Sequence, residues 1–148
     1  IVSPDAGGVE RARAYSKRIG CTLAIVDKRR TRANVSEVMH LIGEVNGKTA
    51  VLLDDMVDTA GTLTHAATAL ASQGATRVLA FATHAVLSGP AVERIEKSPI
   101  EQLTVTDTIA LSEAARASKK ISQVTTAPLI AEAMKRIYGG ESLSSLFV

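Results

Sequence analysis

The chain has 148 residues, a formal net charge of +2 and 46% hydrophobic residues, which is enough for one folded domain with its own core. Aromatic residues make up only 3% of the sequence, so a nucleic-acid-binding protein is not expected, because both strong positive charge and base-stacking side chains are missing. No apolar run reaches the ~18 residues of a membrane span, no signal peptide is visible, and the single Cys21 excludes an internal disulfide and favours a cytoplasmic location.

The predicted elements alternate between strands and helices along the chain. The apolar and glycine patterns predict strands at 1–3, 22–26 and 50–53, a helix at 9–19 closed by Gly20, loops at 4–8 and 27–34, and a segment at 35–45 that fits either a helix or a strand. Further on they predict a helix at 63–71, strands at 77–83, 103–106 and 121–125, helices at 90–96 and 127–138, a partly helical segment at 112–120, and a tail at 141–148 that should dock.

This alternation predicts the α/β class, with a doubly wound, mainly parallel sheet flanked by helices, in a single domain over residues 1–148. The chain opens without an initiator Met, in what already reads as the end of a strand. We therefore expect that something precedes it in the natural protein.

The most informative stretch joins the strand at 50–53 to the helix that follows it. Asp54 and Asp55 come directly after the apolar run, and the short polar segment 58–62 leads into the helix. The unpaired amides at a helix start favour an anion, whereas two acids beside it suit sugar hydroxyls or a divalent cation. A polar turn that only caps the helix is the simpler alternative. The double acid favours a site for a phosphorylated molecule that carries hydroxyl groups.

A second candidate loop follows the first strand. Asp5 precedes the paired glycines Gly7 and Gly8, just before a helix. Glycines allow backbone amides to wrap an anion, and Asp5 could hold Mg²⁺ against it. A flexible turn would explain the same residues, but doubly wound sheets gather such loops at one end, where this loop meets the first motif.

The third motif is a run of cations at 27–34, which contains Lys28, Arg29, Arg30 and Arg32. A charge run is usually a solvated face. Here it follows a strand at the edge where the other loops lie, and positioned Lys and Arg side chains stabilise the charge that develops on a transferred phosphoryl group.

The 54–62 loop resembles the phosphoribosyl-diphosphate loop of the type I phosphoribosyltransferase fold. The three motifs in this order resemble the ribose-phosphate diphosphokinase family, also called phosphoribosyl pyrophosphate synthetases, over the C-terminal half of a two-domain enzyme whose N-terminal half is absent here. Thr83-His84, the segments 87–91 and 129–133, and the ending at Ser142, Ser144 and Phe147 extend the match. Thr31, where many members carry Pro, and Ala85, where Pro or Gly is common, depart from it.

The resemblance implies that the diphosphoryl group of ATP is transferred to the C1 hydroxyl of ribose 5-phosphate, giving AMP and phosphoribosyl diphosphate for nucleotide biosynthesis. It implies Mg²⁺ as cofactor and, typically, a homohexamer built from dimers under allosteric control. Carried over residue by residue, the resemblance implies a 5-phosphate site at Asp58, Thr59, Ala60, Gly61 and Thr62, and ribose contacts at Asp54 and Asp55. It implies a diphosphate loop at Asp5, Gly7 and Gly8, with Asp5 near the metal, and stabilisation of the transition state by Lys28 and Arg30 from a mobile loop. It also implies an allosteric nucleotide or phosphate site at Ser142, Ser144 and Phe147.

Two alternatives stay open at this point. A type I phosphoribosyltransferase would share the 54–62 loop but would need a base-binding hood, for which no segment is visible. A non-catalytic regulatory subunit would share the fold, although intact Lys28 and Arg30 argue against it. Because the family places much of its ATP site on the N-terminal half, we expect this chain alone to bind ribose phosphate with little synthesis.

Overall fold

The structure, a computed structural model, describes residues 1–29 and 38–146. The elements in chain order are β1 (Val2–Ser3), α1 (Val9–Ile19), β2 (Ala24–Arg29), β3 (Val38–Ile42), β4 (Thr49–Val57), α2 (Gly61–Ser72), β5 (Arg77–Ala85), α3 (Ala91–Lys97), β6 (Ile100–Thr106), α4 (Glu113–Ala117), β7 (Ile121–Val124), α5 (Ala127–Gly139) and a short 3-10 helix, η1 (Ser144–Leu146).

Within the described residues the strands form one seven-stranded sheet in the order β3-β2-β1-β4-β5-β6-β7. Neighbouring strands run parallel except β2 and β3, which are antiparallel at one edge. Strand order reverses between β1 and β4, because the chain first builds outward to β3 and then returns to build the other half. The predicted fold class, a mainly parallel sheet flanked by helices, is confirmed.

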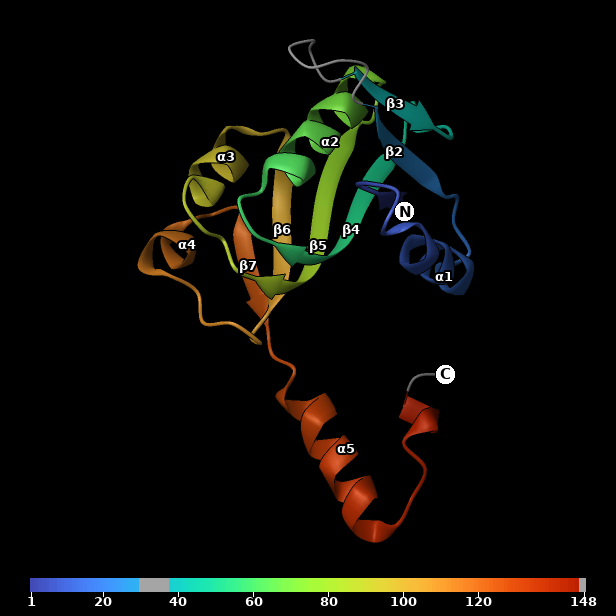
Figure 1. The fold of residues 1–148 in the computed structure, drawn as a ribbon, viewed down its shortest axis with the longest axis vertical. Coiled ribbons are helices and arrows are strands. Elements are labelled where there is room, and N and C mark those ends of the chain that lie inside the picture. The colour runs from blue at the N-terminus through green and yellow to red at the C-terminus, as the bar shows by residue number, and fades with distance from the viewer. Residues whose placement is uncertain (30–37, 147–148) are drawn as a thin grey trace.

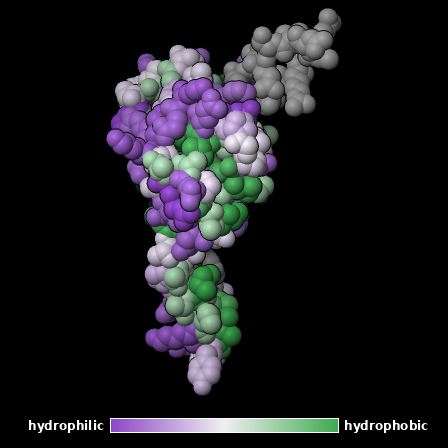
Figure 2. Space-filling view, turned by 90° about the vertical axis from the view of Figure 1, so that its left-hand side faces the viewer, coloured by the Kyte–Doolittle hydropathy of each residue, from purple (hydrophilic) through white to green (hydrophobic). Residues whose placement is uncertain are grey.

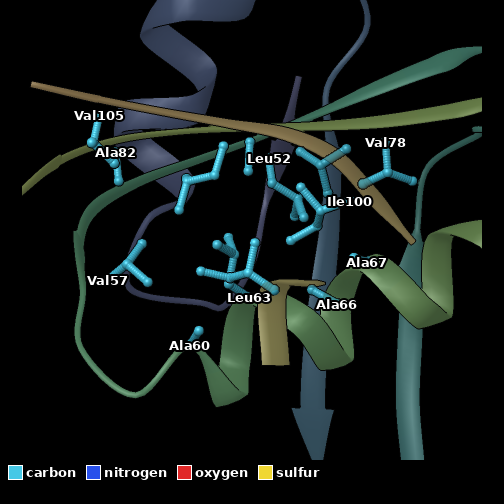
Figure 3. Close-up of a cluster of buried hydrophobic side chains, with 14 of the residues drawn as sticks. Leu52, Val57, Ala60, Leu63, Ala66, Ala67, Val78, Ala82, Ile100 and Val105 are labelled. Atoms are coloured by element: carbon cyan, nitrogen blue, oxygen red, sulfur yellow. The ribbon is translucent and has the colours of Figure 1, made fainter. Parts of the chain in front are cut away.

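The main core lies between the sheet and α2 (Figures 1 and 3). Strands β4 and β5 alternate, so that every second side chain, such as Leu52 and Ala80, is fully buried against this helix. Small residues on α2 let it approach the strands closely, and the buried contributors from the helix are Leu63, Ala66, Ala67 and Leu70. This packing fixes where α2 begins, and therefore where the β4–α2 connection lies.

The opposite face of the sheet is covered only in part by the described residues. Leu53 and Phe81 point to this side and, with Tyr15 and Ile19 of α1, line an apolar hollow of about 330 Å³. Phe81 is 41% exposed and Ile19 is 63% exposed. Parallel sheets are normally covered on both faces, so this face has apolar surface that nothing in the described part of the chain buries.

Strands β4 and β2 run further than their apolar patterns predict. Strand β4 was expected to end at Leu53 but continues to Val57, because its backbone pairs with β5 as far as Ala85. Strand β2 continues to Arg29 through antiparallel pairing with β3. Strands pair through their backbones, so the polar acids of β4 and cations of β2 do not prevent the pairing from continuing. The expectation that Lys28 lies in a loop is therefore wrong for its backbone.

The ambiguous segment at 35–45 contains a strand and no helix in its described residues. Its helical spacing is overridden by pairing with β2, which would otherwise be an open edge. Gly43 ends the strand with φ 108°, and a Cβ there would lie 2.9 Å from the carbonyl oxygen of Leu23. The chain can make this close turn only because residue 43 has no side chain.

Helix α5 extends away from the sheet, and the C-terminal segment follows it (Figure 1). Its apolar side chains are exposed, as the lower part of Figure 2 shows, and include Leu129, Ile130, Met134 and Ile137. The tail was expected to dock, and over residues 141–146 it contacts Arg136 of α5, whose Nη1 lies 3.2 Å from the carbonyl oxygen of Ser142. Among the residues described, no helix is both long and apolar enough to cross a membrane.

Candidate functional site

An open pocket of about 230 Å³ lies at the carboxyl end of β4 and is lined by Asp5 and residues 54–63. Two of the motifs singled out in the sequence therefore meet there. The β1 loop supplies Asp5, and the β4–α2 connection supplies the rest. Their meeting follows from the topology, because β1 and β4 are neighbouring parallel strands at the point where the strand order reverses.

The β4–α2 connection presents a helix start without a side-chain cap. Ala60 precedes α2 in a left-handed conformation with φ 59°, which is uncommon for a residue other than glycine. No side chain in the described part of the protein caps the first amides of α2, and no acid lies in the first turn of this helix. These amides carry partial positive charge, so an anion such as a phosphate is favoured at Gly61 and Thr62.

The segment after β5 braces this connection. Backbone amides of Leu87 and Ser88 donate to the carbonyl oxygens of Val57 and Asp58 at 3.0 and 3.1 Å. The Ser88 hydroxyl also donates to the Asp58 carboxylate. Arg94 of α3 donates from Nη1 to the carbonyl oxygen of Thr59 at 2.9 Å. The Arg94 contact could not be predicted from local sequence, because it joins residues 35 positions apart.

Asp54 and Asp55 lie in the last part of β4 and have different environments. The backbone amide of Asp55 donates to Asp54 Oδ1 at 2.9 Å, whereas Arg11 Nη2 donates to Asp55 Oδ2 at 2.7 Å. Burial, helped by the nearby Asp5 and Asp55 carboxylates, raises the pKa of Asp54 to about 6. Burial also opposes ionisation of Asp55, but the hydrogen bond to Asp54 and the Arg11 charge together lower the pKa of Asp55. The pair therefore joins a readily protonated acid to a firmly ionised one.

This pair predicts a pH dependence of stability. Folded Asp54 keeps its proton to about pH 6, whereas an unfolded Asp releases it near about 3.9, so the folded state binds more protons between these values. We expect the free energy of unfolding of the ligand-free chain, relative to Asp54→Asn, to fall as pH rises from 4 to 7. Urea unfolding of both proteins across this range measures the difference, and a constant difference would contradict the assignment.

Asp107 gives a control of opposite sign. Hydrogen bonds from Thr125 and Thr126 lower the pKa of Asp107 to about 2. Its contribution to stability should be present above the unfolded pKa and be lost only as pH falls below about 4. Asp107→Asn should therefore differ from the wild type by a constant amount between pH 5 and 7, a range in which the Asp54 difference still changes with pH.

The β1 loop is tightly folded in the ligand-free chain. The amide of Gly8 donates to Asp5 Oδ1 at 3.0 Å, and Ser3 Oγ donates to the carbonyl oxygen of Asp5 at 2.7 Å. A Cβ at Gly8 would lie 2.8 Å from Ser3 Oγ, so a side chain there would force Ser3 or the loop to shift. Asp5 lines the pocket, whereas Gly7 and Gly8 are not among its lining residues. An anion that uses the Gly8 amide must replace the Asp5 carboxylate as acceptor.

The remaining predicted site residues either do not line this pocket or lie outside the part of the chain that the structure describes. Lys28 lies in β2, and its side chain, like Arg30 and Phe147 as a whole, falls outside the described residues. Ser142 and Ser144 are exposed on the segment after α5 and do not line the pocket. The roles of Lys28 and Arg30 in catalysis, and the allosteric site at Ser142, Ser144 and Phe147, remain predictions.

The carboxylates fit Mg²⁺ only as part of a shared site. Over residues 1–29 and 38–146, no group of three or more His, Cys, Asp or Glu side chains is arranged to hold a metal. Mg²⁺ is commonly bound by one or two carboxylates together with the phosphates of a substrate. Asp5 and Asp54 act on each other electrostatically and line the same pocket, so they offer such a partial set.

A parallel sheet with this strand order, an acid pair on β4 and an uncapped start to α2 defines a type I phosphoribosyltransferase-like domain. The crystal structure of a phosphoribosylpyrophosphate synthetase from Mycobacterium smegmatis matches 94% of this chain and 44% of that one, with a TM-score of 0.84 and 34% identity. The family model described as phosphoribosyl synthetase-associated domain matches residues 29–148, and the chain belongs to this family.

Curated relatives agree with this assignment. A ribose-phosphate pyrophosphokinase of Xylella fastidiosa (strain 9a5c) is 63% identical over 149 aligned residues, covering 100% of this chain and 46% of the relative. One from Bordetella pertussis is 60% identical over 99% of this chain and 47% of the relative. The predicted resemblance to ribose-phosphate diphosphokinases is confirmed, and the chain spans about half the length of the curated relatives it matches.

Proposed function

We propose that the chain is the ribose 5-phosphate-binding part of a ribose-phosphate diphosphokinase, corresponding to the C-terminal half of that enzyme. The complete enzyme would transfer the β,γ-diphosphoryl group of ATP to the C1 hydroxyl of ribose 5-phosphate, releasing AMP and forming phosphoribosyl diphosphate. The observation that carries the proposal is the pocket at the end of β4, where an anion-favouring helix start and an acid pair lie together in a chain of this family.

The two ends of this pocket bind different parts of the substrate. The 5-phosphate takes the α2 start, where Thr59 and Thr62 add hydroxyl donors to the helix amides. The ribose hydroxyls donate to Asp54 and Asp55, because ionised carboxylates are strong acceptors. Arg94 and Ser88 hold the connection in place through the contacts described above. This arrangement sets the C1 hydroxyl towards the β1 loop.

Asp5, with Asp54 beside it, is the group that would hold Mg²⁺ against the transferred phosphates. When bound, the metal supplies positive charge to the phosphate oxygens. Lys28 and Arg30 complete that charge, the Lys as a movable point charge and the Arg as a planar fork. These residues do not form covalent bonds to the substrate in this scheme, because positioning and charge stabilisation suffice for phosphoryl transfer.

The assembly expected for the family is a homohexamer of dimers, with Ser142, Ser144 and Phe147 at an allosteric nucleotide or phosphate site. Two features support a larger assembly. Helix α5 exposes a row of apolar side chains, and the sheet face beside α1 is partly uncovered. Such surfaces are stabilised by burial against another subunit or against the rest of a longer chain.

Calorimetry with ribose 5-phosphate, ribose and inorganic phosphate tests the binding function directly. We expect ribose 5-phosphate to bind most tightly, because only it reaches both ends of the pocket. If ribose 5-phosphate binds no better than phosphate, the proposal is wrong.

A coupled assay for AMP from ATP and ribose 5-phosphate tests the chemistry. Because the chain spans about half of its relatives, we expect AMP formation by the 148-residue chain to be weak, and to fall further in Lys28→Ala. In the longer protein the same substitution should lower the rate by about 10²-fold or more, the effect of removing one donor to a transition-state anion. An unchanged rate would refute the role of Lys28. Release of diphosphate from phosphoribosyl diphosphate and a base would instead indicate a phosphoribosyltransferase.

A further inference from the structure

Arg11, on the first turn of α1, connects the two loops that form the candidate pocket. Its Nη2 donates to Asp55 Oδ2 at 2.7 Å, and its Nη1 lies 3.6 Å from Asp54 Oδ1. A Cβ built on Gly8 would lie 3.7 Å from the same Nη1, so the guanidinium also packs beside the β1 loop. One side chain therefore lies against both acids of β4 and beside the loop that carries Asp5.

We propose that Arg11 is a positioning residue that sets the orientation of Asp54 and Asp55 towards the ribose hydroxyls and holds the β1 loop against β4. The proposal rests on the function proposed above, since it assigns a task at the same pocket. In the sequence Arg11 reads as one of several cations on the polar side of α1, and only its place on the first helical turn sets it apart.

The place of Arg11 is unfavourable unless the pocket requires it. The N-terminal turn of a helix carries partial positive charge, so a cation there is opposed by the helix dipole. In addition, Arg11 Nη1 is buried and has no hydrogen-bond partner among the residues that the structure describes. Buried donors are nearly always satisfied, and each exception calls for an explanation.

Asp54 Oδ1 lies 3.6 Å from this donor, just beyond hydrogen-bond distance. A small rotation of the Asp54 carboxylate would bring it within reach of Nη1, and Arg11 would then hold both acids with its two terminal nitrogens. Only Arg offers this planar fork, whereas Lys would reach one acid at a time. Ribose hydroxyls that engage Asp54 and Asp55 would meet two carboxylates already held in place.

The charge balance supports the same task. Asp5, Asp54 and Asp55 all line the pocket, and their negative charges repel one another. The same charges would also repel a phosphorylated ligand. Arg11 places a positive charge behind the acid pair, on the α1 side, where it offsets the acids without blocking the pocket. Its side chain is not among the residues that line the pocket.

The test compares two ligands on a set of variants by calorimetry. Arg11→Gln removes the fork, Arg11→Lys keeps the charge, and Arg13→Gln makes the matched change at an exposed position of the same helix. We expect Arg11→Gln to weaken ribose 5-phosphate binding by tenfold or more and to leave inorganic phosphate binding within twofold, because phosphate uses the α2 start alone. Arg11→Lys should fall between Arg11→Gln and the wild type, and Arg13→Gln should match the wild type.

A general loss of structure would weaken both ligands together, so equal losses for phosphate and ribose 5-phosphate overturn the proposal, as does wild-type affinity in Arg11→Gln. If Arg11→Gln does not fold, Arg11→Lys decides, and full affinity there overturns the need for the fork. A wild-type chain that binds ribose 5-phosphate no better than phosphate refutes the proposed function itself, and with it this role. That result is distinct, because it appears before any substitution is made.

Discussion

Replacing Leu52 by alanine should lower the free energy of unfolding of the chain by about 2–5 kcal/mol, the range found for buried leucines. Leu52 is fully buried at the centre of the core between β4 and α2 (Figure 3). The cavity left by the missing atoms would be bounded by strands on one side and by the small residues of α2 on the other, so it could not collapse without moving the helix. Urea unfolding followed by circular dichroism measures this loss.

Leu53 is the matched control because it is the same residue type, one position further along β4. It points to the opposite face, where it lines the open hollow beside α1 and is only partly buried. Leu53→Ala should cost about 1 kcal/mol, in the range of an ordinary partly buried substitution. If both substitutions cost the same, the two faces of the sheet are equally covered in solution and the hollow is closed there.

Local signals explain which elements could be predicted from the sequence. Helix α1 begins and ends where expected, at Val9 and Ile19, with Gly20 as its left-handed C-terminal cap. Helix α5 begins at Ala127 with Pro128 in its first turn, and Gly140 is its left-handed C-terminal cap. Capping and turn residues act over one or two helical turns, so a single sequence records them. The strand and the helix around the acid pair were expected from the apolar run before it and the helical pattern after it, although β4 continues beyond its predicted end.

Non-local contacts explain what could not be predicted. The length of β4 depends on pairing with β5, and the strand character of β3 depends on the edge offered by β2. Arg11 and Asp55 are 44 positions apart, and the sequence around either residue does not indicate that the two side chains meet. The position of a basic residue on the first turn of α1, against the helix dipole, is the one signal that could have drawn attention to Arg11.

Replacing Gly61 by aspartate should have opposite effects on stability and on binding. A Cβ at Gly61 would meet Arg94 Nη1 at 3.6 Å and Thr59 Oγ1 at 3.8 Å, which are ordinary contacts, so a Cβ fits at this position. A negative charge at the start of α2 suits the helix dipole, and the free energy of unfolding should stay level or rise by up to about 1 kcal/mol. The same carboxylate takes the place of the 5-phosphate and repels it.

The loss of ribose 5-phosphate affinity should be about 100-fold or more, which corresponds to about 3 kcal/mol, the upper range for a hydrogen bond to a charged group. Gly61→Asn separates size from charge, because it has nearly the same shape without the negative charge and should lose about tenfold. Calorimetry on the three proteins, beside their unfolding curves, gives both quantities. A Gly61→Asp chain that binds ribose 5-phosphate as tightly as Gly61→Asn would show that charge at the α2 start does not matter. The phosphate would then have to lie elsewhere, with the acid pair of β4 serving another ligand.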